Sequence, residues 1–174
     1  PGMLFRSEPV VQALEERKSF YENQDQQVRS ILLTPQGKPF QQKKAEELNA
    51  CDECLLLICG RYEGFDERIR DYVDEEISLG DYVISGGELA ALTMADSILR
   101  NIPGVLGNEL SPQYDSFAGG LQGSLEYPVY TRPPVFEEQE VPPVLLSGDH
   151  KKIEAWRDLQ SLEKTKRLRP DLLR

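Results

Sequence analysis

The chain has 174 residues, of which 39% are hydrophobic, and this is enough for one core and a small second one, because domains usually hold roughly 100 to 150 residues. Its formal net charge of −10 argues against unspecific binding to nucleic acids, since phosphate contacts need clustered Lys and Arg. No apolar run approaches the roughly 18 residues of a membrane span, and no stretch has the layout of a signal peptide. We therefore expect a soluble, cytoplasmic protein.

The first third of the chain predicts two helices and two strands. Residues 9–21 place apolar side chains at helical spacing among charges, which indicates an amphipathic helix that begins at a proline. Residues 29–34 are a short β-rich run that the Pro-Gln-Gly at 35–37 stops, and residues 41–50 have a helical pattern. Residues 54–59 are continuously apolar, which is typical of a strand buried on both faces, as in a parallel sheet.

The middle of the chain predicts a third strand that leads into a long helix. Residues 66–72 can form a short charged helix, and residues 81–85 have the pattern of a strand that ends in two glycines. Ser85 and Glu88 have the spacing of a capping box, and apolar residues then repeat at helical intervals as far as Ile102. The alternation of strands and helices predicts an α/β fold with a parallel sheet.

Residues 104–130 are rich in Gly, Ser, Pro and Asn. In a compact protein such a long irregular stretch is usually functional or a linker, so we place a domain boundary there. Further along, Ile153, Trp156 and Leu159 recur at helical spacing and predict another helical segment.

The end of the chain is basic although the whole is acidic. Residues 150–174 hold eight Lys and Arg against four acids, a net charge of +4, which leaves −14 on the remainder. A basic end on an acidic body fits the docking of a structured RNA, and it fits a solvated helix face equally well.

Three cysteines lie close together, at 51, 54 and 59. An odd number in one short stretch does not make a disulfide framework, so we expect reduced thiols. The Cys51–Cys54 spacing resembles half of a zinc knuckle, but no second Cys/His pair follows and the only histidine, His150, is distant. Buried or boundary thiols are the favoured interpretation.

Three glycine-bearing turns follow the expected strands, at 34–37, 60–64 and 85–88. Ligands of open α/β sheets bind beyond the carboxyl ends of the strands, and glycines let a ligand approach backbone groups that can recognise a purine edge. Each glycine taken alone is equally consistent with a simple turn. Neither the dinucleotide-binding glycine pattern nor the phosphate-binding loop is present, which disfavours a nicotinamide or nucleotide-hydrolysing site.

Six sequence blocks stand out, in order, over nearly the whole chain. They are CGRYEGFDER at 59–68, ISLGDYVISGGEL at 77–89, IPGVLG at 102–107, DSF at 115–117, YTRP at 130–133 and VPPVLLSG at 141–148. Together they resemble bacterial tRNA (guanine-N1)-methyltransferase. Their order and spacing are far more specific than any single motif.

The resemblance implies the SPOUT class, an α/β parallel-sheet fold with a deep trefoil knot at the cofactor site, followed by a small, mostly helical C-terminal domain. It divides the chain into a knotted catalytic domain at 1–106, a linker and active-site loop at 107–126, and an incomplete tRNA-binding domain at 127–174. Family members begin earlier, with a first strand and a glycine-rich loop, and continue further, so we expect a truncated form. Thr34 stands where the family often has Ser, and Ala90 where Pro is common.

The resemblance also implies S-adenosylmethionine as the cofactor, bound by the knot loops mostly through backbone groups. Glu63 is expected to bind the methionine amine of the cofactor or to hold Mg²⁺. The implied cofactor contacts are Leu33, Thr34, Pro35, Gly60, Tyr62, Glu63, Gly64, Ser78, Leu79, Gly80, Tyr82, Ile84, Gly86 and Gly87.

The implied reaction is methylation of N1 of guanosine 37, next to the anticodon. Guanine N1 carries a proton at neutral pH, so a base is required, and the resemblance makes Asp115 that base. Arg100 is implied as the cation that stabilises negative charge on O6. The residues alone are consistent with a helix cap for Asp115 and a helix C-terminal charge for Arg100.

The family forms an antiparallel homodimer whose active site lies between subunits, with the base donated across the interface. Phosphate contacts would position the tRNA, and the target base would be flipped into the pocket. The residues implied to grip the anticodon stem are Arg132, His150, Lys151, Lys152 and Arg157.

Two other functions stay open at this point. A knotted ribose 2′-O-methyltransferase would need a base or an activating Arg near a sugar hydroxyl, and it lacks the block at 115–117. A non-catalytic RNA-binding module is the alternative from another class, if truncation has removed essential parts.

Overall fold

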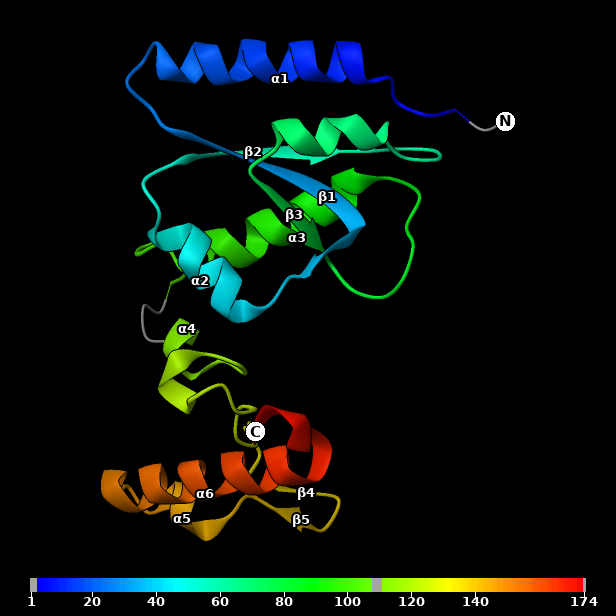
Figure 1. Ribbon diagram of the computed structural model, residues 1–174. Coiled ribbons are helices and arrows are strands. Elements are labelled where there is room, and N and C mark those ends of the chain that lie inside the picture. The colour runs from blue at the N-terminus through cyan, green and yellow to red at the C-terminus, as the bar shows by residue number, and fades with distance from the viewer. Residues whose placement is uncertain (1–2, 108–110, 174) are drawn as a thin grey trace. The chain divides into compact units, whose positions relative to one another are not determined.

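A computed structural model of the protein describes residues 3–107 and 111–173 (Figure 1). Residues 108–110 of the predicted linker, and Pro1 and Gly2, lie outside the described residues. The chain divides into two compact units, Pro1–Val105 and Leu106–Arg174. None of the helices in the two described ranges is long and apolar enough to cross a membrane.

The first unit is built on a parallel sheet of three strands in the order β2-β1-β3. The central strand β1 (Val28–Pro39) pairs in parallel with β2 (Cys54–Cys59) and with β3 (Glu75–Ser78). Helices connect the strands, as parallel pairing requires. The predicted α/β fold with a parallel sheet is confirmed.

Helices α2 (Gln42–Ala50) and α3 (Gly87–Leu99) pack on one face of the sheet (Figure 1). Ile31 and Leu33 of β1 point to this face, because alternate residues of a strand share a face. The core cluster is completed by Ala45, Leu48, Ile77, Ala90, Met94 and Ile98.

The other face of the sheet is covered by α1 (Ser7–Glu22) and the short 3-10 helix η1 (Glu67–Tyr72), which contact each other. The carboxylate of Asp74 joins this layer to the sheet. It accepts a hydrogen bond from Ser30 N at 2.8 Å and one from Lys18 Nζ at 3.3 Å. Ser30 is fully buried in the central strand. Asp74 satisfies its remaining polar groups, because Ser30 Oγ donates to the same carboxylate at 2.5 Å and Ser30 O accepts from Asp74 N at 3.0 Å.

Strand β2 is more exposed than its apolar sequence predicts. All six of its residues are partly exposed, so the expectation of a strand buried on both faces is wrong. The reason is its position, since β2 pairs with β1 on one side and with no other strand of the described ranges.

The third strand does not lie where the sequence predicts it. Residues 81–85 form an irregular segment in which Val83 is 85% exposed, and β3 comes earlier, at Glu75–Ser78. Glu76 within β3 forms an ion pair with Arg70, which compensates a charge in a partly buried strand. The edge of β1 at which residues 81–85 were expected to pair is paired with Glu75–Ser78 instead.

Strand β1 continues past the stop expected at 35–37. Its pairing with β3 shifts register between Leu33 and Lys38, so the turn residues become a bulge inside the strand. A Cβ atom on Gly37 would lie only 2.4 Å from the backbone N of Ile77. The bulge therefore requires glycine at this position.

Helix α3 confirms the predicted long helix but not its predicted cap. Gly86 is the N-cap and provides no side-chain hydrogen bond. The expected capping box of Ser85 and Glu88 is wrong, because the Glu88 carboxylate accepts from Arg61 Nε at 2.6 Å instead. The helix ends before Ile102, which the apolar pattern had included.

The second unit is organised around α6 (His150–Leu168), which confirms the predicted helical segment. Buried Ser161 and Thr165 bind the preceding loop, because Ser161 Oγ donates to Leu125 O at 2.6 Å and Leu125 N donates to Thr165 Oγ1 at 2.9 Å. Its other elements are α4 (Ser111–Tyr114), η2 (Gly119–Leu121), β4 (Val135–Phe136), β5 (Gln139–Glu140), α5 (Pro143–Leu146) and η3 (Pro170–Leu173).

Candidate functional site

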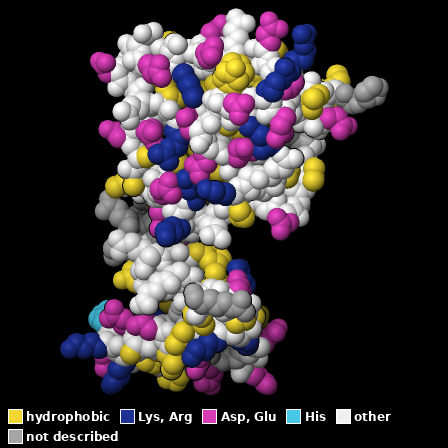
Figure 2. Space-filling model, in the orientation of Figure 1, with side chains coloured by type: hydrophobic (Ala, Val, Ile, Leu, Met, Phe, Trp, Pro, Cys, Tyr) yellow, Lys and Arg dark blue, Asp and Glu magenta, His cyan; other side chains and the backbone are white. Residues whose placement is uncertain are grey.

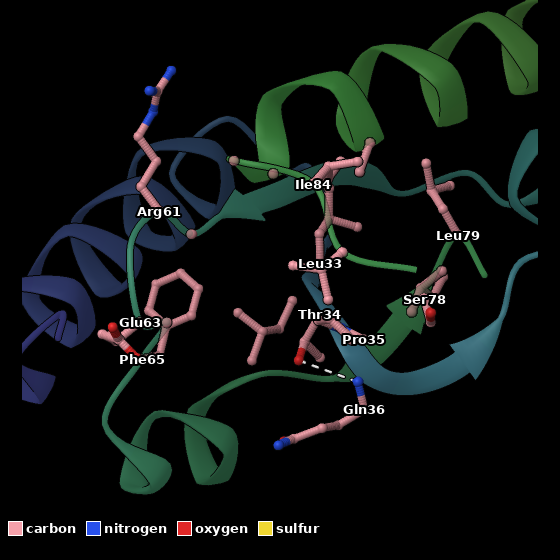
Figure 3. Close-up of a pocket in the computed structure, with 18 of the residues that line it drawn as sticks. Leu33, Thr34, Pro35, Gln36, Arg61, Glu63, Phe65, Ser78, Leu79 and Ile84 are labelled. Carbon is pink, nitrogen blue, oxygen red and sulfur yellow. Dashed lines mark hydrogen bonds between the residues drawn. The ribbon is translucent and has the colours of Figure 1, made fainter. Parts of the chain in front are cut away.

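A cavity of about 350 Å³ opens in the first unit, beside the carboxyl ends of its parallel strands (Figure 3). Three segments, 32–36, 60–67 and 77–87, supply most of its lining. They are distant in sequence and meet here because β1 lies between β2 and β3. This is the sheet edge at which α/β proteins bind their ligands.

The structure brings together every residue that the sequence analysis assigned to the cofactor. All of the following line the cavity: Leu33, Thr34, Pro35, Gly60, Tyr62, Glu63, Gly64, Ser78, Leu79, Gly80, Tyr82, Ile84, Gly86 and Gly87.

The sequence analysis missed further residues of the lining. Several of them belong to the sequence block at 59–68, which could have indicated them. Arg70 lies outside every block, and only the fold brings it to the cavity. The additional lining residues are Leu32, Gln36, Arg61, Phe65, Asp66, Glu67, Arg70, Ile77, Val83, Ser85 and Ala90.

Hydroxyl groups hold two of the lining loops in shape. Thr34 Oγ1 accepts a hydrogen bond from Gln36 N at 3.4 Å, inside the bulge of β1 (Figure 3). Ser78 Oγ accepts from Gly80 N at 3.2 Å and lies 3.1 Å from Gly80 O, to which it donates. The backbone around the cavity is thus shaped by local side-chain contacts.

The loop after β2 and the start of α3 are in direct backbone contact. Gly87 N donates to Gly60 O at 2.8 Å. A Cβ atom on Gly87 would lie 2.8 Å from the Cα of Cys59, so only glycine permits this approach. The second and third glycine turns therefore form one continuous wall.

Several charged groups beside the cavity are paired. Arg61 and Glu88 form an exposed ion pair at the start of α3, and the hydrogen bond from Arg61 lowers the pKa of Glu88. Hydrogen bonds from the Arg68 side chain and backbone lower the pKa of Asp66 to about 2. At the end of β2, burial raises the pKa of the Cys59 thiol and keeps it neutral.

Comparison with known proteins supplies the family. The family model described as tRNA (Guanine-1)-methyltransferase TrmD matches residues 1–174. The chain belongs to this family. Membership places the parallel sheet and its cavity in the SPOUT class of methyltransferases.

Relatives in the family are similar along almost the whole chain. A tRNA (guanine-N(1)-)-methyltransferase of Desulfitobacterium hafniense (strain Y51) is 55% identical over 171 residues, which are 98% of this chain and 62% of the relative. Proteins of the same name from Staphylococcus carnosus (strain TM300) and Staphylococcus aureus (strain JH9) are each 53% identical over 173 residues, 99% of this chain and 67% of theirs. The chain thus spans about two thirds of the length of these relatives.

The two residues that the family resemblance made catalytic do not line the cavity. Arg100 is the C-cap of α3, at the end of the helix opposite to Gly87. Asp115 belongs to the second unit, in the turn after α4, where its carbonyl oxygen accepts from Ala118 N at 3.1 Å. The cavity is built from the first unit without either residue.

The residues that the resemblance assigned to tRNA all lie exposed on the second unit. His150, Lys151 and Lys152 form the first turn of α6, where Lys152 Nζ is 3.0 Å from a carboxylate oxygen of Asp149. Arg132 precedes the β4–β5 hairpin, and the Arg157 guanidinium lies 4.7 Å from the ring centre of Tyr127.

Glu63, the candidate for Mg²⁺, is exposed at the cavity edge. Within residues 3–107 and 111–173, no group of three or more His, Cys, Asp and Glu side chains is arranged to hold a metal ion. A role in Mg²⁺ binding stays a prediction.

Proposed function

We propose that this chain transfers the methyl group of S-adenosylmethionine to N1 of guanosine 37 in tRNA, in the cytoplasm. The observation that carries the proposal is the cavity at the carboxyl edge of the sheet, lined by glycine-bearing turns in a chain of this methyltransferase family. The names of the relatives support the same substrate.

The residues of the cavity fit the cofactor in size and in chemistry. About 350 Å³ lies within the range of ligand pockets, roughly 300 to 1,000 Å³. Leu33, Leu79 and Ile84 offer apolar contacts for an adenine ring, and the exposed backbone of the glycine turns offers hydrogen bonds to its edge. Glu63 is the carboxylate that we assign to the methionine amine.

When bound, S-adenosylmethionine supplies an electrophilic methyl group. The work of the chain is to make guanine N1 nucleophilic. We assign Asp115 as the base that takes the N1 proton onto its carboxylate, and Arg100 as the cation that stabilises the negative charge left on O6.

The position of Arg100 supports an active site shared by two subunits. Roughly 20 Å of helix separate it from Gly87 at the cavity, at about 1.5 Å per residue. Between these ends α3 exposes a row of leucines: Leu89 is 62% exposed, Leu92 67% and Leu99 49%. We propose that this face meets a second copy in an antiparallel homodimer, so that the cavity of one subunit faces catalytic residues of the other.

We further propose that the loops around the cavity tie the trefoil knot of the class. The tight contact between Gly60 and Gly87 supports this, because it fastens the loop after β2 to the start of α3. The second unit, with its exposed cations on α6, is the part that we assign to tRNA binding.

The proposal is tested by mapping the methylated atom. The 174-residue chain is incubated with a tRNA transcript and S-adenosylmethionine labelled in its methyl group, and the product nucleosides are separated by mass spectrometry. We expect 1-methylguanosine at position 37 and no transfer to a transcript carrying adenosine there. Label on a ribose 2′-oxygen assigns the other knotted activity, and cofactor binding without transfer to RNA rejects the proposal for this chain.

A further inference from the structure

The second unit, which we assign to tRNA binding, contains a larger cavity, of about 880 Å³. It lies between the extended segment 127–134, helix α5 and the first half of α6. All of its walls come from the second unit. Beyond the extended segment they are formed by Val141, Leu145, Leu146, Ile153 and Arg157.

The charge of this cavity is opposite to that of the chain. Its 13 lining residues, all within 111–173, include Arg132 and Arg157 but no Asp or Glu, whereas the whole chain has a net charge of −10. A cavity whose only ionised lining groups are guanidinium groups is complementary to an anionic ligand. Arginine in particular suits phosphate, because its planar fork can donate two parallel hydrogen bonds.

The walls of the cavity are aromatic and apolar. Tyr130 is 48% exposed and its ring centre lies 6.4 Å from that of Trp156, while Arg157 covers the ring of Tyr127. Leu146 is 63% exposed. Figure 2 shows yellow apolar side chains together with dark blue cations on the surface of this unit. Exposed apolar side chains around a cavity are a feature that binding sites share.

We propose that this cavity binds an unpaired nucleotide of the tRNA, with the base against Tyr130 and the phosphate at Arg132 and Arg157. The inference rests on the proposed function and adds a second point of recognition to it. Aromatic faces and arginines are the groups that proteins use to bind splayed bases of RNA loops. An acidic peptide would leave the apolar walls unused, and an apolar peptide would bury two guanidinium groups without partners.

The test uses substitutions at exposed positions, so that folding is preserved. Leu146→Glu places a negative charge in the cavity, and Leu159→Glu places the same charge on α6 at a position that is 52% exposed and outside the lining. We expect Leu146→Glu to weaken binding of full-length tRNA, measured by fluorescence anisotropy, by tenfold or more. Leu159→Glu should change it by less than twofold.

A second pair of variants tests the aromatic contact itself. Tyr130→Phe keeps the ring and should keep the affinity for tRNA, whereas Tyr130→Leu should lose roughly tenfold, in the range of one base–aromatic stack. With tRNA that carries 4-thiouridine at single unpaired positions, we expect one position to crosslink to residues 127–157 in the unaltered chain. Circular dichroism of each variant shows whether α6 is intact.

The outcomes separate this inference from the proposed function. Equal tRNA affinity for Leu146→Glu and Leu159→Glu, in a chain that methylates tRNA, overturns the nucleotide site and leaves the methyltransferase standing. Crosslinking to residues 127–157 without methyl transfer leaves the nucleotide site standing and rejects the activity. A change of sedimentation mass in Leu146→Glu with unchanged RNA affinity assigns the cavity to a protein contact and also overturns the inference.

Discussion

The pair of Asp66 and Arg68 beside the cavity shows how single residues set the acid stability of this loop. The pKa of Asp66 falls from 3.8 to about 2 because Arg68 binds the ionised carboxylate. A lowered pKa in the folded state stabilises the fold above the unfolded value, and this contribution is lost as the pH falls toward the folded value.

Asp66→Asn should therefore make the free energy of unfolding less steeply dependent on pH between about 4 and 2, the interval between the two pKa values. Urea titrations at several pH values in that window measure the slope. Arg68→Gln should flatten it in part, since it removes the cation and its side-chain hydrogen bonds but keeps the hydrogen bond from the backbone N of residue 68. If both variants keep the slope of the unaltered chain, the pair does not govern acid stability.

Asp115 carries the proposed chemistry and lies outside the unit that forms the cavity. Asp115→Asn keeps the size of the side chain but cannot take the N1 proton, so methyl transfer should fall by about a hundredfold or more. Calorimetry should show unchanged affinity for S-adenosylmethionine. Asp158→Asn, at an exposed acid of α6, is the matched control and should keep full activity. Full turnover by Asp115→Asn would falsify its role as the base.

At the scale of the structural element, the loops rather than charged side chains shape the cavity. A Cβ atom on Gly86 would meet the flexible ends of Glu88 and Arg61, and the backbone of Gly86 is extended, so a larger residue is compatible with the fold. Gly86→Val should nevertheless intrude on the lining and abolish S-adenosylmethionine binding in calorimetry, with helical content retained. Gly119→Val, at a glycine with open space around its Cβ position, should bind normally. Unchanged cofactor affinity in Gly86→Val would mean that the cofactor binds elsewhere.

Helix α3 carries apolar side chains on two faces, one that is buried in the core and one that is exposed. Met94 and Ile98 are buried in the core, while Leu92 on the outer face is 67% exposed. Leu92→Glu should leave the core intact and reduce the sedimentation mass from dimer to monomer at micromolar concentration. Leu159→Glu on α6 serves again as the control and should not change the mass. A dimer that persists in Leu92→Glu would remove this face from the interface.

Much of the first unit was predictable from local sequence patterns, and the elements that were predicted wrongly have physical reasons. The helices at 9–21 and 41–50 were found because periodic apolarity indicates a buried face, and the strand at 54–59 was found from its continuous apolarity although all six of its residues are partly exposed. The strand β3 was missed because it contains two acids, and one of them, Glu75, is compensated by Lys44, which is distant in sequence. Residues 81–85 have a β-rich sequence, but the edge of β1 pairs with Glu75–Ser78.

The candidate site was predictable to a similar degree. The first glycine turn lies inside β1 and the third follows an irregular segment, yet the fourteen assigned residues meet at one cavity, because the family resemblance and not the predicted strand ends selected them. The ion pair of Arg61 with Glu88 could not be predicted, because it depends on how α3 lies against the loop after β2. The separation of Arg100 from Gly87, in contrast, follows from the length of the helix.

On the scale of the whole molecule, an acidic chain is proposed to bind an acidic polymer. Binding should therefore depend on the few exposed cations of the second unit and weaken steeply with salt. Replacing Lys151 and Lys152 by Gln should reduce the slope of log affinity against log salt by about one to two units, at about 0.9 per phosphate contact. Lys38 and Lys43, exposed on the first unit, provide the matched double variant, which should keep the slope. An unchanged slope in the first pair would assign those lysines to a solvated helix face.

The position of β2 at the margin of the sheet bears on the colloidal behaviour of the protein. This strand combines a Leu-Leu-Leu-Ile run, partial exposure of every residue and an outer row of backbone groups without a strand partner in the described ranges. Short, uncharged, apolar segments with an open hydrogen-bonding edge are templates for strand addition and fibril growth. We therefore expect concentrated or partly unfolded samples to associate through this edge.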